Sequence, residues 1–458
     1  MLRRLLKKHS FGLRFRSNLV NQEPTITQLS TLPNGLRVAS ENIGGETTSV
    51  GVYIDSGSRF EDERSNGTAH FLEHISFKGT SRRTQTDIEL EIENAGAHLN
   101  AYTSREQTAY YARVFKKDLP LAIDILSDIL QNSLLEDQAI ERERSVILRE
   151  YEEIEKQTEE VVFDLLHAVA FPNNSLGMTI LGPPNNIKSI KREDLLAYIK
   201  SNYHAPRMVL AAAGSVDHNE LVESAGKSFD KLTSGIGTGN VAVPLFTGAE
   251  VRHHDGTNPL AHVAIAVEGA SWTSPDYFPL LIASSVIGAW NKGLAGGGLN
   301  LSGKLAQIVS QNDLAQSFMS FLSPYSDTGL FGIYLVSHKP RQLDDLIYEV
   351  QQEWVRICLS LTDAEVERAK LQLKSAALLS LDGTQQICED IGRQILAYGK
   401  RYDWKEVHRL IDAVDTKTVK QIASDYLYDR CPAVVGIGNI GGLPDYNRIR
   451  AATLWLRN

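Results

Sequence analysis

The sequence predicts an α/β protein, an α+β sandwich, made of two similar domains related by internal duplication. Three observations lead to this prediction. The chain has 458 residues, which is too many for a single hydrophobic core. Apolar segments with strand and helix periodicity alternate without long structureless gaps. Segments of the second half also resemble segments of the first. We therefore expect each domain to hold a mixed, mostly antiparallel sheet flanked by helices.

The first domain is predicted over residues 27–233. Pro33-Asn34-Gly35 is a turn signal between two short strands, so a hairpin opens the domain. The other expected elements are, in order, a strand at 50–55, a helix starting at Thr68, a short helix at 87–94, strands at 97–103 and 108–114, a helix at 119–131, a long charged helical segment at 136–170, a helix at 187–203, a strand at 208–215 and a helix at 218–229.

The second domain is predicted over residues 250–458, after a linker at 234–249 that is rich in Gly, Thr and Val. Residues 262–268 resemble residues 49–55, and a closing strand at 433–438 resembles 209–214. Two copies of one domain are the economical explanation of this similarity.

Composition excludes several classes of protein. The net charge of −9 argues against a nucleic-acid-binding protein and suits a basic partner. No apolar run approaches the roughly eighteen residues of a membrane-spanning helix. Cys358, Cys388 and Cys431 are far apart, so we expect a reducing compartment and no disulfide framework.

The first 22 residues differ from the rest of the chain because they are basic, amphipathic and free of acidic residues. Their basic residues are Arg3, Arg4, Lys7, Lys8, Arg14 and Arg16. This composition predicts a mitochondrial transit peptide over residues 1–22, and the alternative is a basic tail or interface arm.

The segment 67–75 holds the chemistry-bearing motif His70-x-x-Glu73-His74. On a helix these three side chains share one face, and two imidazoles beside a carboxylate form a transition-metal site, for which zinc is the leading candidate. Zinc makes water acidic, and Glu73 is then placed to act as the general base. The alternative is an amphipathic helix that binds no metal. The matching positions of the second half are Ala283, Val286 and Ile287, so only the first domain is predicted to be catalytic.

A catalytic zinc site needs a third protein ligand, and the charged segment supplies two acids. Glu143 and Glu150 lie seven residues apart, two helical turns, on one stripe. The residues alone leave both open as the ligand, because each could instead pair with a neighbouring arginine.

Six stretches of the chain match sequence motifs of a known protein family. They are 66–74, 77–80, 89–94, 98–106, 139–144 together with Glu150, and 379–383 together with 389–394. Through them the chain resembles the M16 (pitrilysin) family of metallopeptidases from about residue 27 to 445. The resemblance implies that His70, His74 and Glu150 bind one Zn²⁺ and that Glu73 is the base. The resemblance also implies that Glu143 does not bind the metal itself but supports a metal-bound histidine.

Within the family, the resemblance is to beta-type subunits, and it implies a function. We expect a zinc metalloendopeptidase that removes N-terminal transit presequences from proteins imported into the mitochondrial matrix, acting as a heterodimer with an alpha subunit. One alternative is a core subunit of the respiratory cytochrome bc1 complex, structural or bifunctional. The other is an M16 peptidase that acts alone.

The resemblance also implies where a basic presequence binds. Glu160 and Asp164 match an acidic pair that takes an arginine two residues before the cut, which bidentate guanidinium pairing explains. Without the family, these two acids could equally form a solvated helix face. Asn100 and Ala101 match an edge strand to which an extended substrate adds by main-chain hydrogen bonds.

Two aromatic residues complete the predicted site. Phe77 matches the position that receives the residue after the cut, although its sequence context alone indicates a core residue. Tyr325, after Ser323-Pro324, could reach the active site from the second domain and stabilise an oxyanion, and a packed tyrosine is the alternative.

Overall fold

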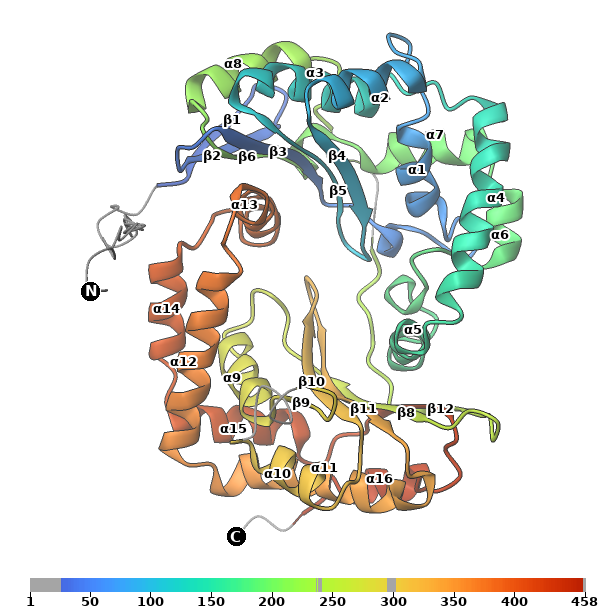
Figure 1. Ribbon diagram of the computed structural model, residues 1–458, viewed down its shortest axis with the longest axis vertical. Coiled ribbons are helices and arrows are strands. Elements are labelled where there is room, and N and C mark those ends of the chain that lie inside the picture. The colour runs from blue at the N-terminus through green and yellow to red at the C-terminus, as the bar shows by residue number, and fades with distance from the viewer. Residues whose placement is uncertain (1–25, 236, 238–240, 295–301, 456–458) are drawn as a thin grey trace, which may run out of the picture.

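The computed structural model of the chain describes residues 26–235, 237, 241–294 and 302–455, and the predicted transit peptide therefore lies outside the described residues. Two sheets with helices on their outer faces form the upper and lower halves of the molecule in Figure 1. None of the helices in the described ranges is long and apolar enough to span a membrane.

The first sheet has the strand order β1-β2-β6-β3-β5-β4, and only its β2–β6 pair is parallel. Its strands are β1 (Gln28–Thr31), β2 (Arg37–Asn42), β3 (Thr47–Ile54), β4 (His98–Thr103), β5 (Thr108–Phe115) and β6 (Met208–Gly214). The associated helices are α1 (Thr68–Ser76), α2 (Gln85–Asn94), α3 (Leu119–Gln131), α4 (Asp137–Ile154), α6 (Pro184–Ser189), α7 (Arg192–Asn202) and α8 (His218–Ser228). Apolar side chains of α1, α3, α7 and α8 pack against the sheet in one core.

The second sheet has the order β7-β12-β8-β11-β10-β9, with one parallel pair, β7–β12. Its strands are β7 (Glu250–His254), β8 (Ala261–Glu268), β9 (Ala289–Asn291), β10 (Ser317–Pro324), β11 (Gly329–Ser337) and β12 (Ala433–Gly438). The associated helices are α9 (Tyr277–Ile287), α10 (Lys304–Gln311), α11 (Leu343–Ser360), α12 (Asp363–Leu379), α14 (Trp404–Asp412), α15 (Thr416–Leu427) and α16 (Tyr446–Ala451).

The predicted duplication is confirmed by the strand order. Five strands of one sheet, β2-β6-β3-β5-β4, match five of the other, β7-β12-β8-β11-β10. The segments that resemble one another in the sequence are β3 and β8, and β6 and β12, which occupy equivalent places. Each sheet then adds one edge strand of its own, β1 in the first and β9 in the second.

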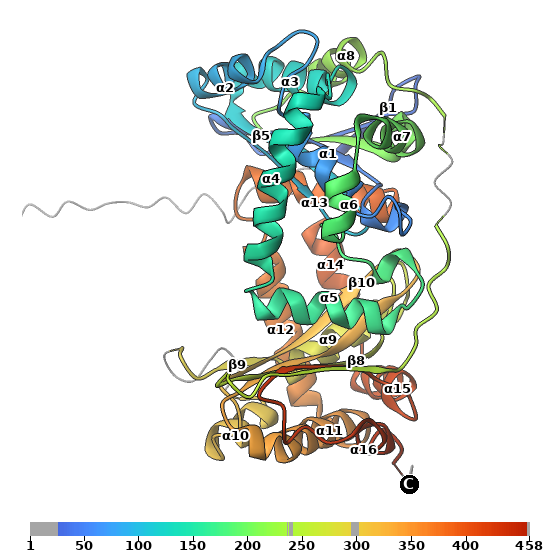
Figure 2. The same ribbon diagram turned by 90° about the vertical axis from the view of Figure 1, so that its right-hand side faces the viewer.

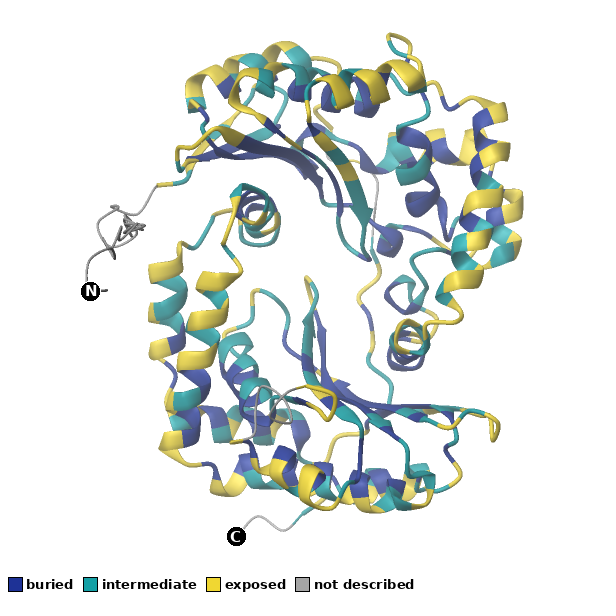
Figure 3. Ribbon diagram, in the orientation of Figure 1, coloured by how far each residue is buried: buried dark blue, intermediate teal, exposed yellow. Residues whose placement is uncertain are grey.

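One helix from each half covers the sheet of the other half, and we call α5 (Thr158–Ala170) and α13 (Thr384–Tyr398) the exchanged helices. Helix α5 lies on the second sheet (Figure 2). Its side chains Val162 and Leu166 belong to the core that it forms with that sheet. Helix α13 packs through Cys388 and Ile391 against the first sheet. The central strands β3, β6 and β8 are accordingly buried (Figure 3).

The exchange explains a difference from the sequence prediction. The expected helical segment at 136–170 consists of two helices, because the chain breaks between α4 and α5 at residues 155–157. Helix α4 stays on the first half, whereas the apolar side of α5 turns onto the second sheet. Both segments carry charged residues, so they looked like one continuous helix in the sequence. They are distinguished by their packing, because only α5 packs against the second sheet.

Candidate active site

Helix α1 carries the His-x-x-Glu-His motif, and a buried carboxylate anchors its first turn. The helix begins after Gly67, whose φ of +103° suits glycine, and a Cβ there would lie 2.6 Å from the Leu181 carbonyl oxygen. The Glu61 carboxylate accepts hydrogen bonds from the backbone N–H of Gly67 (2.9 Å) and Ala69 (2.6 Å) and from the Asn66 side chain (2.9 Å). A carboxylate at this end also complements the helix dipole. Glu61 therefore fixes where the motif starts.

Sequence reasoning missed Glu61 because it lies in a polar loop that reads as surface. Only 6% of its surface is exposed, and burial raises the pKa of Glu61 even against three N–H donors. No pattern in the sequence marks a loop acid as the anchor of the helix that follows.

The structure brings His70, His74 and Glu150 together. One donor atom from each lies within 4.8 Å of the others. His74 Nε2 is 3.2 Å from Glu150 Oε2, and His70 Nε2 is 3.8 Å from Glu150 Oε1. Zinc bonds of about 2.0–2.2 Å in a tetrahedron separate ligand atoms by roughly 3.3–3.6 Å. The three donors are therefore close enough to one another for a single metal ion to bind between them after small adjustments of their side chains.

The electrostatics of the two histidines differ. Burial lowers the pKa of His70, and the neighbouring His74 lowers it further, so His70 is the neutral imidazole that a metal requires. Burial opposes a charge on His74 as well, but the acids around it outweigh burial and raise its pKa. Donor type, spacing and the protonation of His70 all suit a divalent metal with nitrogen and oxygen ligands.

Two acids of α4 contact opposite nitrogens of His74. Glu150 lies at Nε2, whereas Glu143 Oε2 is 3.4 Å from Nδ1. Glu143 is buried, and its other oxygen pairs with Lys78 Nζ at 2.9 Å. Glu143 can therefore hold the Nδ1 tautomer of His74 while Glu150 faces the cluster. Lys78 lies one turn after His74 and was not identified from the sequence. Its ion pair with Glu143 holds the carboxylate that contacts His74.

Glu73 lies on the same helix, half-buried between the motif histidines and β4. Burial raises the pKa of Glu73 and outweighs the opposite effects of the Thr103 side chain and of His74. Its Oε2 is buried and has no hydrogen-bond partner among the described residues. A carboxylate with a raised pKa and an unsatisfied oxygen is suited to accept a proton from a bound reactant.

The predicted substrate residues lie on two elements near the cluster. Strand β4, with Asn100 and Ala101, is the edge of the first sheet and contacts α1. Phe77 follows α1 directly, is half-buried, and packs 6.0 Å from the Tyr110 ring, measured between centroids. Its environment combines a core contact with partial exposure.

The acidic pair lies on α5, where Glu160 is exposed and Asp164 is half-buried. Asp164 is ion-paired to Arg105 at 2.6 Å. The Tyr325 hydroxyl donates to His167 Nε2 at 2.6 Å, and the His167 Nδ1–H donates to the Phe163 carbonyl oxygen. The structure thus joins Tyr325 to α5 and gives its hydroxyl no contact with His70, His74 or Glu150.

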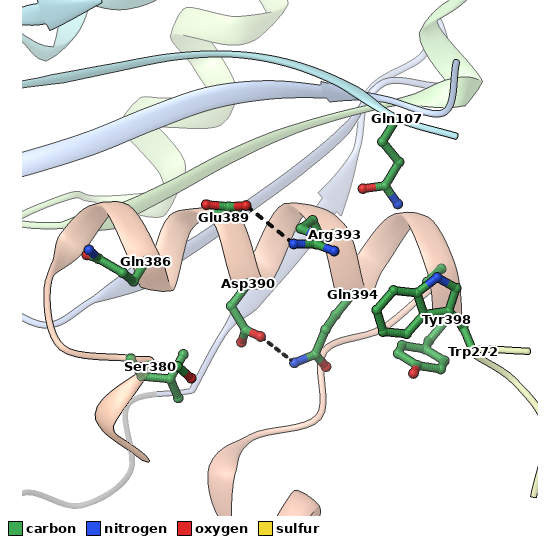
Figure 4. Close-up of a pocket in the computed structure, with 11 residues that line it drawn as sticks. Gln107, Trp272, Ser380, Gln386, Glu389, Asp390, Arg393, Gln394 and Tyr398 are labelled. Carbon is green, nitrogen blue, oxygen red and sulfur yellow. Dashed lines mark hydrogen bonds and ion pairs between the residues drawn. The ribbon is translucent and has the colours of Figure 1, made fainter. Parts of the chain in front are cut away.

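A separate cavity of about 360 Å³ lies along α13, between this helix, Gln107 and Trp272 (Figure 4). Glu389 pairs with Arg393 on its wall. The lining includes none of the metal-cluster residues, so this cavity is distinct from the cluster.

Comparison with known proteins identifies the family. The model of "Insulinase (Peptidase family M16)" matches residues 37–184, and that of "Peptidase M16 inactive domain" matches 189–373. The chain is 54% identical to the mitochondrial-processing peptidase subunit beta of Lentinula edodes over 98% of both chains. It is 52% identical to the human protein of that name over 94% of this chain and 88% of the relative.

A solved structure shares the fold across nearly the whole molecule. It is a chain of complex III2 from Candida albicans with Inz-5 bound, with a TM-score of 0.83, 27% identity, and coverage of 93% of this chain and 100% of that chain. Its identity to this chain is about half that of the peptidase relatives. The chain therefore belongs to peptidase family M16 of metallopeptidases, in the group of mitochondrial-processing peptidase beta subunits.

Proposed function

We propose that the chain is the catalytic subunit of a mitochondrial zinc endopeptidase that removes presequences from imported proteins. The observation that supports this most is the grouping of His70, His74 and Glu150 around one point with Glu73 beside it. The relatives' name, which contains the words "subunit beta", supports an alpha-type partner with which the chain would form a heterodimer. The presequence as substrate follows from the family resemblance.

His70, His74 and Glu150 would hold the metal, and Glu143 would orient His74. Zinc bound there supplies the Lewis acidity that makes water a nucleophile at neutral pH. Glu73 takes the proton of the attacking water and returns it to the leaving amine. Its raised pKa makes it able to hold that proton between the two steps.

The substrate would bind as an extended strand along β4. Main-chain hydrogen bonds at Asn100 and Ala101 give affinity without sequence selection. Glu160 and Asp164 would take an arginine two residues before the cut, and Phe77 would contact the residue after it. We leave Tyr325 out of this mechanism because its hydroxyl is bound to His167.

The domain boundaries and location are part of the same proposal. Residues 27–233 would form the catalytic domain, 234–249 the linker and 250–458 the non-catalytic domain. The basic segment 1–22 would direct the chain to the mitochondrial matrix and be removed, which N-terminal sequencing of the mature protein tests.

A core subunit of a respiratory complex is the second function that an observation supports, through the fold match with complex III2. The complete His-x-x-Glu-His set and the much higher identity to processing peptidases favour the peptidase. The two functions are compatible in one chain, so the test must measure catalysis directly.

The test uses the chain co-purified with its alpha-type partner. We expect one zinc per beta-type chain and cleavage of a basic presequence peptide. Cleavage should stop when a chelator removes the metal and return when zinc is added. Cleavage that persists in a metal-free preparation would contradict the proposal.

A further inference from the structure

The turn between β4 and β5, residues 104–107, links the edge strand to α5. Its Arg105 side chain is buried, with 9% of the residue exposed. Arg105 Nη2 donates to Asp164 Oδ1 at 2.6 Å, and Nε donates to the Leu176 carbonyl oxygen at 3.2 Å. An arginine of the chain itself therefore already occupies one oxygen of the acid that would bind the substrate's arginine.

This contact holds Asp164 in one orientation. Asp164 follows Glu160 by four residues on α5, so both carboxylates lie on one helix face. The Asp164 side chain stays 32% exposed although Arg105 binds it, so it remains accessible to a ligand. A planar guanidinium with a second, backbone acceptor restricts rotation of the carboxylate that it holds. A carboxylate fixed in advance loses less entropy when a substrate binds.

The contact also sets the charge of the acidic pair. Glu160 and Asp164 carry two negative charges when ionised, and Arg105 compensates one of them. One substrate guanidinium then neutralises the remainder.

The turn itself is held from the second half of the molecule. Glu106 accepts hydrogen bonds from the backbone N–H (3.0 Å) and hydroxyl (2.7 Å) of Ser326 and from the Arg59 guanidinium. Arg59 also pairs with Asp327 at 2.6 Å and donates its backbone N–H to the Arg105 carbonyl oxygen at 2.8 Å. The backbone of Arg105 is thus fixed by its hydrogen bond from Arg59 and by the contacts of the next residue, Glu106, with Ser326.

We propose that Arg105 is a positioning residue for substrate selection, which holds Asp164 so that the Glu160–Asp164 pair accepts one arginine in one register. This inference rests on the proposed function, because it assumes that the pair binds the substrate. The inference adds Arg105 to the residues that select the substrate, although Arg105 contacts Asp164 and not the substrate. Through Arg105, the acidic pair is connected to the turn that follows strand β4.

The experiment uses the purified heterodimer and presequence peptides with arginine, lysine or alanine two residues before the cut. For Arg105→Gln, we expect KM for the arginine peptide to rise about tenfold with kcat within twofold. The alanine peptide should be cut at an unchanged kcat/KM. Arg105→Lys, which retains the charge, should recover part of the preference for arginine.

Arg83→Gln is the matched control. Arg83 is also a largely buried arginine and pairs with Glu91, Asp124 and Asp128, but it contacts neither Asp164 nor the metal cluster. The Arg83→Gln variant should have a lower melting temperature and an unchanged preference for arginine over alanine before the cut. The melting temperatures of Arg105→Gln and Arg105→Lys are measured beside it.

The outcomes separate this inference from the proposed function. Absence of cleavage by the wild-type heterodimer overturns the proposed function. Cleavage with an undiminished preference for arginine in Arg105→Gln overturns only the inference. An equal loss for all three peptides shows a purely structural role of Arg105 and overturns it as well. Loss confined to the arginine peptide, with partial recovery in Arg105→Lys, supports it.

Discussion

The two halves of the molecule share a strand order, but they differ at the sheet edge that lies beside the first helix of each sheet. Strand β4 is the last strand of the first sheet and contacts α1. Its counterpart β10 is covered, because β9 pairs with Ser317, Phe318 and Met319. An edge that can accept an extended peptide is therefore present in the first half and covered along these residues in the second.

The helices that follow β3 and β8 differ in the same sense. Helix α1 presents two histidines and a glutamate, whereas α9 carries Ala283, Val286 and Ile287 at the matching positions. All three residues of α9 are buried in the apolar core of the second half. The second copy has kept the packing of this helix and replaced its chemistry with core residues.

The partner helices α4 and α12 complete the comparison. Counted from the first residue of each helix, Glu143 and Glu150 of α4 correspond to Ala369 and Ala376 of α12. Between α9 and α12 lies a largely apolar cavity of about 690 Å³, lined by Ala376 among other residues. The metal ligands, the base and the supporting acid are thus absent from the matching positions of the second half, and its sheet edge is covered along residues 317–319. These features behave as one functional unit, separable from the fold.

The largest expected effect comes from exchanging the base. Glu73→Gln removes the proton acceptor but keeps the shape of the side chain, so cleavage should fall by about 10²–10⁴-fold with the zinc content unchanged. The measurement is kcat of the heterodimer together with metal analysis. Val286→Ala is the control at the matching position, where the loss should be about 1–3 kcal/mol of stability with activity retained. Near-normal activity of Glu73→Gln would refute the assigned base.

The next largest effect is expected from Glu143, the acid that contacts His74 Nδ1. Glu143→Gln should weaken zinc binding by about 10–100-fold, because a neutral amide holds the imidazole less firmly and leaves Lys78 without its charged partner. Competition with a chromogenic chelator measures the affinity. Glu353→Gln, a buried acid of α11 paired with Arg356, is the control and should leave the affinity unchanged. Equal affinities for all three proteins would show that Glu143 has no part in metal binding.

The smallest effect concerns the open edge. N-methylation of the substrate backbone beside the cut removes a main-chain donor, so KM should rise by about tenfold if the peptide adds to β4 as a strand. The same modification ten residues away in the peptide serves as the control. A KM that is insensitive to both modifications would show that recognition depends on side chains alone.

Local patterns in the sequence predicted the duplication, the strands of the first half, the two second-half strands at 262–268 and 433–438, and the helix that carries the metal motif. The other four strands of the second half were not predicted. Local patterns also placed Glu143 and Glu150 on one stripe, but could not choose between them, because both lie on the same face two turns apart. The structure distinguishes them by which nitrogen of His74 each contacts. Such a difference depends on tertiary geometry and has no signal in residue spacing.

Other features could not be predicted because they join residues far apart in the chain. The carboxylate of Glu61 reaches the first turn of α1 from a polar loop, and Tyr325 reaches His167 from the other half. Arg105 looks like an ordinary turn residue in the sequence. Each of these side chains acquires its role from a contact that neither hydrophobic periodicity nor helix propensity encodes.

The exchanged helices have a consequence for biosynthesis. The inner face of the first sheet is covered by α13, whose residues Thr384–Tyr398 come about 170 positions after the last strand of that sheet, β6. A chain that emerges from a ribosome or a translocation channel therefore exposes this apolar face until most of its length is available. Each half produced by itself would lack the helix that covers one face of its sheet.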